Sequence, residues 1–269
     1  MVTAAGIRSI SALARDRVRE DQLGVQAGSL TYGAFLAIPP LLVLGLAALS
    51  LVLSNDPPAQ QRAVESVTSL VPGLDEVVHT QFTQTSAQQV GVGILGGLAL
   101  LWAVSSFAVR VRTALGVIFR TGVPTLLAGR ISGTGLGLVI VVCLAAYASG
   151  IAWASRQVVA WWTAALIGLA IAAIGVALAL FVYWSLTPGE DRPSVREHVP
   201  GAVALLLMGV ALELLGALYV ANVVARTTAI YGAIGAIFGL FAFLYLAMWA
   251  FLVGAELSEI VRERRAQVL

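Results

Sequence analysis

Glu213 is the residue whose type and position most suggest chemistry, because it is an acid inside a long apolar run, 201–222. An ionised carboxylate at membrane depth costs several kcal/mol. We therefore expect its side chain to face the protein interior, where it finds a partner or takes up a proton. Two roles stay open: a proton-coupling or substrate-binding group, or a protonated acid that hydrogen-bonds between helices. Gly209 and Gly216 share its helical face, and such small residues favour close helix packing.

The pair Pro39-Pro40 is the second feature, since it lies near the middle of another apolar run, 30–54. Proline lacks an N–H and its ring clashes with the preceding turn, so the carbonyls of Phe35 and Leu36 lose their helical partners. We expect a helix break here. If the break lines a cavity, its free carbonyls could coordinate a cation or a polar headgroup. A purely structural kink is the alternative.

Further polar and small residues could join or support such a site. The polar ones lie within or at the ends of apolar runs: Thr31, Tyr32, Asn222 and Tyr231. Three glycines of the last run recur on one helical face and predict tight helix packing: Gly232, Gly235 and Gly239. We expect the acids at the end of that run, Glu256 and Glu259, to be solvated partners of Arg262 and Arg264.

Several chemistries lack their residues. The only histidines, His79 and His198, lie outside the apolar runs, so a serine–histidine pair or a histidine-bound zinc in the membrane has no base or ligand. The single Cys143 can form neither an intramolecular disulfide nor a cysteine metal site. No GxxxxGK[ST] loop is present, which excludes ATP-driven transport by this chain. We expect no catalytic residue, no metal and no cofactor.

The elements that must position these residues are membrane helices. The chain is 59% hydrophobic and 11% charged, with a mean hydropathy of +0.92, which is far from the composition of a soluble domain. Its arginines lie in short loops, so no nucleic-acid partner is expected. We predict an all-α bundle of six transmembrane helices in one domain, 1–269, because six runs are long enough to span a membrane: 30–54, 91–109, 131–154, 159–184, 201–222 and 231–257.

The arginines predict the orientation of the chain. Of the 16 basic residues all but Arg62, Arg156 and Arg226 fall on one side of this arrangement, so both termini are predicted to face the cytoplasm. Residues 1–29 then form a cytoplasmic segment, 30–257 the bundle and 258–269 a cytoplasmic tail. The extracytoplasmic connection, 55–89, has apolar residues at helical spacing and is predicted to be amphipathic, capping the bundle or lying on the membrane.

Several stretches resemble the YihY/BrkB family of bacterial inner-membrane proteins: AGSLTYGAFLAIPPLLVL (27–44), RTALGVIF (112–119), LTPGEDRPSVREHVPGA (186–202) and 211–257. The resemblance implies a six-helix membrane protein, with transport or envelope-lipid handling as the usual expectation. The family often has Asn where this chain has Gly116, which puts any role of that side chain in doubt. A ribonuclease label also attached to the family finds no support, since the loops offer no metal or acid–base cluster.

Together these observations predict a non-ATP-driven transporter or lipid-handling protein of the bacterial cytoplasmic membrane, with a polar site between Pro39-Pro40 and Glu213. Its partners would be the bilayer and a lipid or small-solute substrate, and a homo-oligomer stays open. The second interpretation is a membrane scaffold without transport activity. An intramembrane enzyme or ribonuclease is the weakest interpretation, because the spans contain no nucleophile–base pair.

Overall fold

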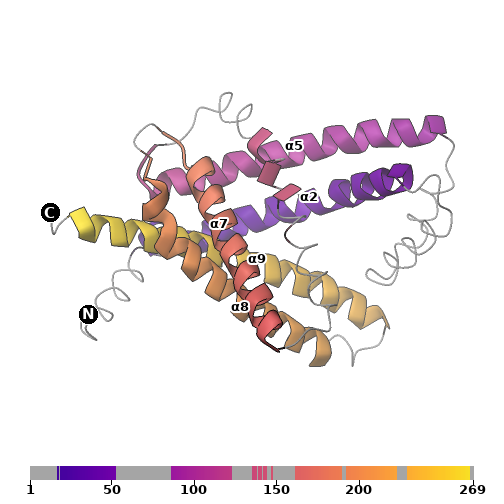
Figure 1. Cartoon of the computed structure of the whole chain (residues 1–269). Coiled ribbons are helices and arrows are strands. Elements are labelled where there is room, and N and C mark those ends of the chain that lie inside the picture. Colours follow the sequence, from indigo (N-terminus) through magenta and orange to yellow (C-terminus); the bar gives the residue numbers. More distant parts are fainter. Residues whose placement is uncertain are drawn as a thin grey trace.

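The computed structural model describes residues 17, 19–52, 86–122, 161–189, 192–222 and 229–266, together with 135–137, 139–140, 142–143 and 147. Within these ranges the secondary structure is helical and contains no strand (Figure 1). The helices in chain order are α2 (Leu23–Val52), α5 (Ser86–Ile118), α7 (Trp161–Leu186), the short 3-10 helix η1 (Val195–His198), α8 (Val199–Asn222) and α9 (Ala229–Ala266).

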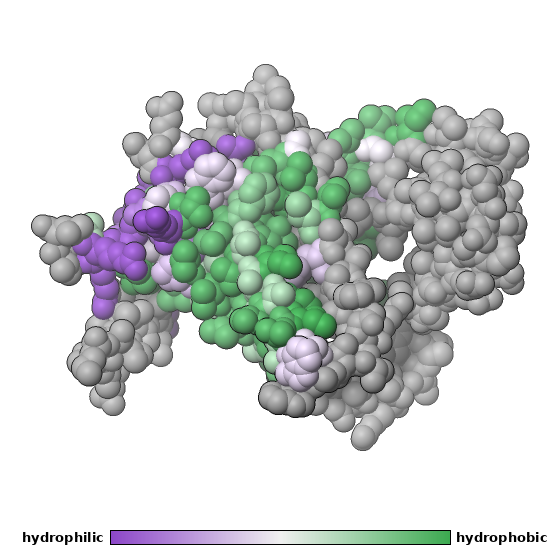
Figure 2. All heavy atoms as spheres, in the orientation of Figure 1, coloured by the Kyte–Doolittle hydropathy of each residue, from purple (hydrophilic) through white to green (hydrophobic). Residues whose placement is uncertain are grey.

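The outer faces of these helices are apolar. Leu169 on α7, Leu214 on α8 and Phe238 on α9 are 69%, 64% and 71% exposed. Figure 2 shows one continuous hydrophobic face with hydrophilic residues gathered at one end. So large an apolar surface is unfavourable in water but favourable in lipid. Helices also satisfy their backbone hydrogen bonds internally, as a lipid environment requires. The apolar faces are therefore lipid-facing surfaces of a membrane protein.

Four described stretches are long and apolar enough to cross a membrane: Gly96–Ile118, Ala165–Leu186, Val195–Gly216 and Ile237–Ala266. They match the predicted second, fourth, fifth and sixth spans, although α9 continues through most of the predicted tail. The predicted third span, 131–154, is described only in short helical pieces. The connection 55–89 lies outside the described residues up to Ser86. The count of six spans therefore stays a prediction.

The first predicted span coincides with α2, but it is not broken at the prolines. α2 is assigned as one helix of 30 residues with Pro39 and Pro40 inside it. The predicted interruption is wrong in this respect, because losing the proline N–H groups has not ended the helix. Such losses are tolerated in membrane helices when neighbouring groups and small backbone adjustments compensate.

The tightest packing lies at the end of the bundle where α2 begins and α5, α7 and α9 end. Figure 2 shows hydrophilic residues gathered at one end. We call it the basic end, because these arginines lie near the helix ends that meet there: Arg17, Arg110, Arg120, Arg192 and Arg262. Its core side chains are at most 1% exposed: Leu23, Leu30, Leu115, Ile118, Phe119, Tyr183 and Leu252. The arginine count predicts that the arginines of this end lie on a single side of the membrane. Which side it faces stays a prediction.

Candidate functional site

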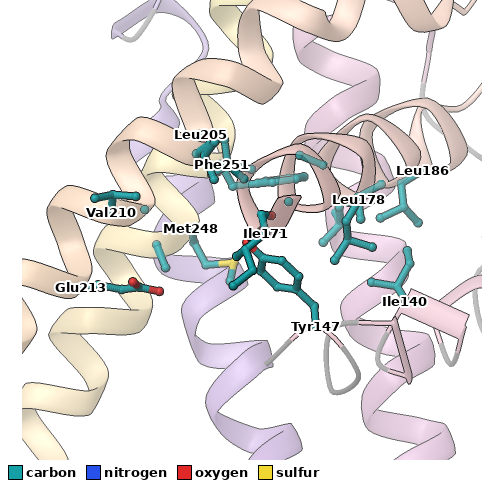
Figure 3. A pocket seen from close by; sticks show the side chains of 18 of the residues that line it. Ile140, Tyr147, Ile171, Leu178, Leu186, Leu205, Val210, Glu213, Met248 and Phe251 are labelled. Carbon is teal, nitrogen blue, oxygen red and sulfur yellow. Dashed lines mark hydrogen bonds between the residues drawn. The ribbon is translucent and has the colours of Figure 1, made fainter. Parts of the chain in front are cut away.

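A pocket of about 530 Å³ opens between α5, α7, α8, α9 and the described residues Ile140 and Tyr147 (Figure 3). Its lining residues come from helices that are far apart in the sequence; Phe107 on α5 and Phe251 on α9 are examples. Apart from Glu213 and Tyr147, all lining residues are apolar or glycine. The pocket is thus an apolar site of ordinary ligand-binding size with very few polar groups.

Two glycines leave part of the pocket open because they have no side chain. A Cβ added at Gly168 on α7 or at Gly209 on α8 would meet no atom within 4 Å, so both glycines border open space. Gly175 instead accommodates Tyr147, whose hydroxyl lies near the position of the missing Cβ and donates a hydrogen bond to the main-chain oxygen of Ile171 at 3.2 Å. The predicted helix-packing role does not hold for Gly209, because the pocket takes the place of a neighbouring helix.

Glu213 is the only acid that lines the pocket. Its carboxyl group points from α8 toward the side on which Met248 and Tyr147 lie (Figure 3). It makes no ion pair with any residue in the described part of the chain. The residue is exposed rather than enclosed between packed helices. The structure therefore places Glu213 at the edge of an apolar pocket with an open side, rather than enclosed in the protein interior.

The first-span candidates do not join Glu213. No residue of α2 lines the pocket. The Thr31 hydroxyl donates to the main-chain oxygen of Ala27 at 2.7 Å within α2. Tyr32 is 52% exposed, and the Arg110 guanidinium lies 5.9 Å from its ring centroid. The single site predicted between the proline pair and Glu213 is therefore not assembled in the described residues; Pro39 is instead exposed on α2.

The structure describes the surroundings of only some of the other predicted residues. Gly216 is in ordinary contact with the Phe243 ring on α9, at 3.7 Å from the added Cβ. Gly235 and Gly239 are half-buried on α9. Asn222, Tyr231 and Gly232 lie in helices, but their side-chain surroundings are outside the described residues. Their binding and packing roles stay predictions.

The closest helix approach involves glycines that the predicted stripes do not include. α8 and α9 cross at Gly201 and Gly254, where a Cβ on either residue would overlap the backbone of the other. The Gly201 N–H also donates to the Ser258 hydroxyl at 3.0 Å. Sequence reasoning missed this contact because neither glycine belongs to the predicted stripes, and only the crossing of the two helices brings them together.

Gly116, the departure from the family pattern, has a structural explanation. An added Cβ would collide with the main-chain oxygen of Gly122 and meet the Pro188 ring. The turn after α5 folds back here, with the Thr121 N–H donating to the Gly116 oxygen at 3.1 Å and Gly122 at φ 88°. An asparagine side chain at position 116 would therefore collide with this turn.

The acids at the end of α9 are buried, which corrects the expectation that they are solvated. Glu256 and Glu259 are each 1% exposed. The pairing of Glu259 with Arg262 is confirmed, with N–O distances of 2.6 and 2.8 Å. Arg17 bonds both carboxylate oxygens of Glu263 at 2.7 and 2.9 Å. The N-terminal segment therefore covers this end of α9, and nothing local in the sequence indicates that cover.

These features define an all-helical, multi-pass membrane protein with an apolar pocket and a buried polar cluster at its basic end. Residues 14–268 match the family described as Virulence factor BrkB, and the chain belongs to this family. It is also similar to a UPF0761 membrane protein of Pseudoalteromonas translucida (strain TAC 125), with 27% identity over 270 residues that cover 90% of this chain and 82% of the relative. No solved structure matches the chain. The resemblance noted from the sequence is thus confirmed.

Proposed function

We propose that the chain is a lipid-handling protein of the bacterial cytoplasmic membrane that works without ATP. An acyl chain occupies the pocket, and the Glu213 carboxylate selects a headgroup that is cationic or donates hydrogen bonds. The observation that supports this proposal is the combination of a large apolar pocket with a single carboxylate. The proposal assigns no catalytic residue.

The walls favour a lipid over a small hydrophilic solute. A solute would have to give up hydration for a surface on which only Glu213 and Tyr147 offer polar atoms. The neighbouring faces of α7 and α8 carry exposed leucines, including Leu166 and Leu207 at 59% and 65% exposed. A lipid can therefore enter from the bilayer along a surface that is apolar throughout.

Selectivity must then come from the headgroup. An acyl chain that moves from the bilayer into the pocket exchanges one apolar surrounding for another, so its transfer gains little free energy. A hydrogen bond from an amine headgroup to the Glu213 carboxylate would contribute about 1.5–3 kcal/mol, as charge-assisted hydrogen bonds do. A headgroup without such a donor would leave the carboxylate without that bond.

Filling the pocket tests the proposal most directly. We expect purified protein in proteoliposomes to scramble fluorescent lipids, and Gly209→Leu to abolish this activity because a side chain there grows into the pocket. Gly97→Leu on α5 is the matched control, since its added Cβ also meets no atom within 4 Å but Gly97 does not line the pocket. Equal activity of wild type and Gly209→Leu would contradict the proposal.

The headgroup preference forms a second measurement. Glu213→Gln should scramble lipids with amine and phosphoglycerol headgroups at similar rates, whereas the wild type should favour the amine. A wild type that moves neither lipids nor solutes and retains one stoichiometric protein partner on cross-linking would instead favour the scaffold interpretation.

A further inference from the structure

The carboxyl group of Glu256 on α9 is buried at the basic end, and Glu256 does not line the pocket. The side chain is 1% exposed, and neither carboxylate oxygen receives a hydrogen bond from any N–H or O–H of the described residues. A buried charge in this position is costly. Such groups are therefore paired, hydrogen-bonded or neutralised.

Asp21 lies in the segment that runs along this stretch of α9. On one side of it a Cβ added at Gly24 would lie 3.4 Å from the Tyr245 hydroxyl, and on the other side Arg17 pairs with Glu263. Like the Glu256 carboxyl oxygens, the Asp21 Oδ2 is buried without a donor among the described residues. The turn before α2 holds Asp21 in place: its N–H donates to the Arg17 oxygen at 2.9 Å, and the Gln26 side-chain amide donates to its main-chain oxygen at 2.7 Å. Because ionised carboxylates only accept hydrogen bonds, these two can bond each other only if one carries a proton.

Two ion pairs of the described residues lie beside this contact, Arg17 with Glu263 and Arg262 with Glu259. Each pair is neutral as a unit, so ionised Asp21 and Glu256 would add two negative charges next to them. Arg17 also acts on Glu256 from the N-terminal side, while Glu259 on α9 adds repulsion. One proton is the smallest change that relieves this excess.

Another titratable group on this side of α9 is His198 in η1. Its ring is buried against Phe119 and Tyr183, at centroid distances of 4.8 and 6.0 Å. Only its main-chain oxygen connects it to α9, by accepting from the Ser258 hydroxyl at 3.3 Å. His198 therefore faces the aromatic core and does not pair with Glu256.

We propose that Asp21 and Glu256 form a proton-binding carboxyl pair that holds the start of α2 against the end of α9. One proton bridges a carboxylic acid and a carboxylate; its release to water leaves two carboxylates, whose repulsion loosens this contact. The ligand proposed for this pair is a proton; in the described part of the chain no three His, Cys, Asp or Glu side chains converge as metal ligands do. The site does not depend on the proposed function of the pocket.

Infrared difference spectroscopy of the full chain in nanodiscs tests the pair. We expect the wild type to show the carbonyl stretch of a protonated carboxyl that disappears as the pH is raised, and Glu256→Gln and Asp21→Asn each to lose this titrating band. Glu20→Gln is the matched control, because Glu20 is exposed in the same segment. Glu213→Gln separates any band that belongs to the pocket.

Thermal unfolding supplies a readout that spectroscopy alone lacks. The melting temperature of the wild type should fall as the pH rises past the loss of the band, since both carboxylates are then buried and ionised. Glu256→Gln should remove this fall, and Asp21→Asn serves if that variant does not fold. A band that persists in both variants overturns the proposal. So does loss of the band on adding magnesium chloride at constant pH, which would show a metal ion in place of the proton.

Discussion

The basic end and the pocket lie along the same helices but use glycine in opposite ways. At the basic end Gly201 and Gly254 bring the backbones of α8 and α9 into contact, whereas at the pocket Gly168 and Gly209 face open space. Polar groups follow the same division: the basic end holds two partly buried ion pairs, Arg17 with Glu263 and Arg262 with Glu259, whereas Glu213 at the pocket makes no ion pair with the described residues. A membrane bundle can therefore place its stability in one region and keep another free for a ligand.

The largest difference in stability between these two regions is expected when a glycine of α8 is replaced by leucine in each of them. Gly201→Leu forces a side chain into the backbone of α9, and overpacking of this kind costs about 3 kcal/mol or more. Gly209→Leu on the same helix meets open space and should leave the free energy of unfolding nearly unchanged. Melting curves of both variants in nanodiscs check the pair; equal destabilisation would show that the two regions do not differ as described.

The next largest effect is expected when a paired acid is removed. Glu259→Gln takes the counter-charge from Arg262 in a site where the Glu259 side chain is 2% and the Arg262 side chain 31% exposed. We expect a loss of about 2 kcal/mol, because charge-assisted hydrogen bonds of buried acids are strong but Arg262 is partly hydrated. Chemical unfolding at low and high salt would measure it, with exposed Glu20→Gln as the control.

The sequence predicts the features that depend on local interactions better than those that depend on contacts between distant segments. Long apolar runs predict helices because the cause is local: in lipid each backbone group must bond within its own segment. A lone acid in such a run, Glu213, likewise indicates a cavity. The burial of Glu256 is not predictable this way, since it depends on the N-terminal segment that covers it, and a nearby arginine makes the acid look solvated. The sequence also does not predict that Pro39 lies away from the pocket, because this position depends on which helices pack against α2.

A smaller loss is expected from one hydroxyl in the core of the basic end. The Tyr183 hydroxyl donates to the main-chain oxygen of Phe251 at 2.7 Å, and Tyr183 is fully buried. Tyr183→Phe leaves that oxygen without this donor while it keeps the ring, so we expect a cost of about 1 kcal/mol. Tyr147→Phe provides the comparison at the pocket. Its bond to Ile171 is longer, at 3.2 Å, and its loss should destabilise less in the same melting assay.

The smallest effect on stability is expected at Glu213, and this result would sharpen the comparison most. Glu213 has no ion pair in the described residues and lies at an open side of the pocket, so Glu213→Gln removes a charge that no other group compensates. The free energy of unfolding should change by less than about 0.5 kcal/mol, as for substitutions away from packed or paired groups. The headgroup preference should nevertheless disappear. A clear loss of stability would instead mean that Glu213 holds helices together, and the pocket would then belong with the basic end as a structural region.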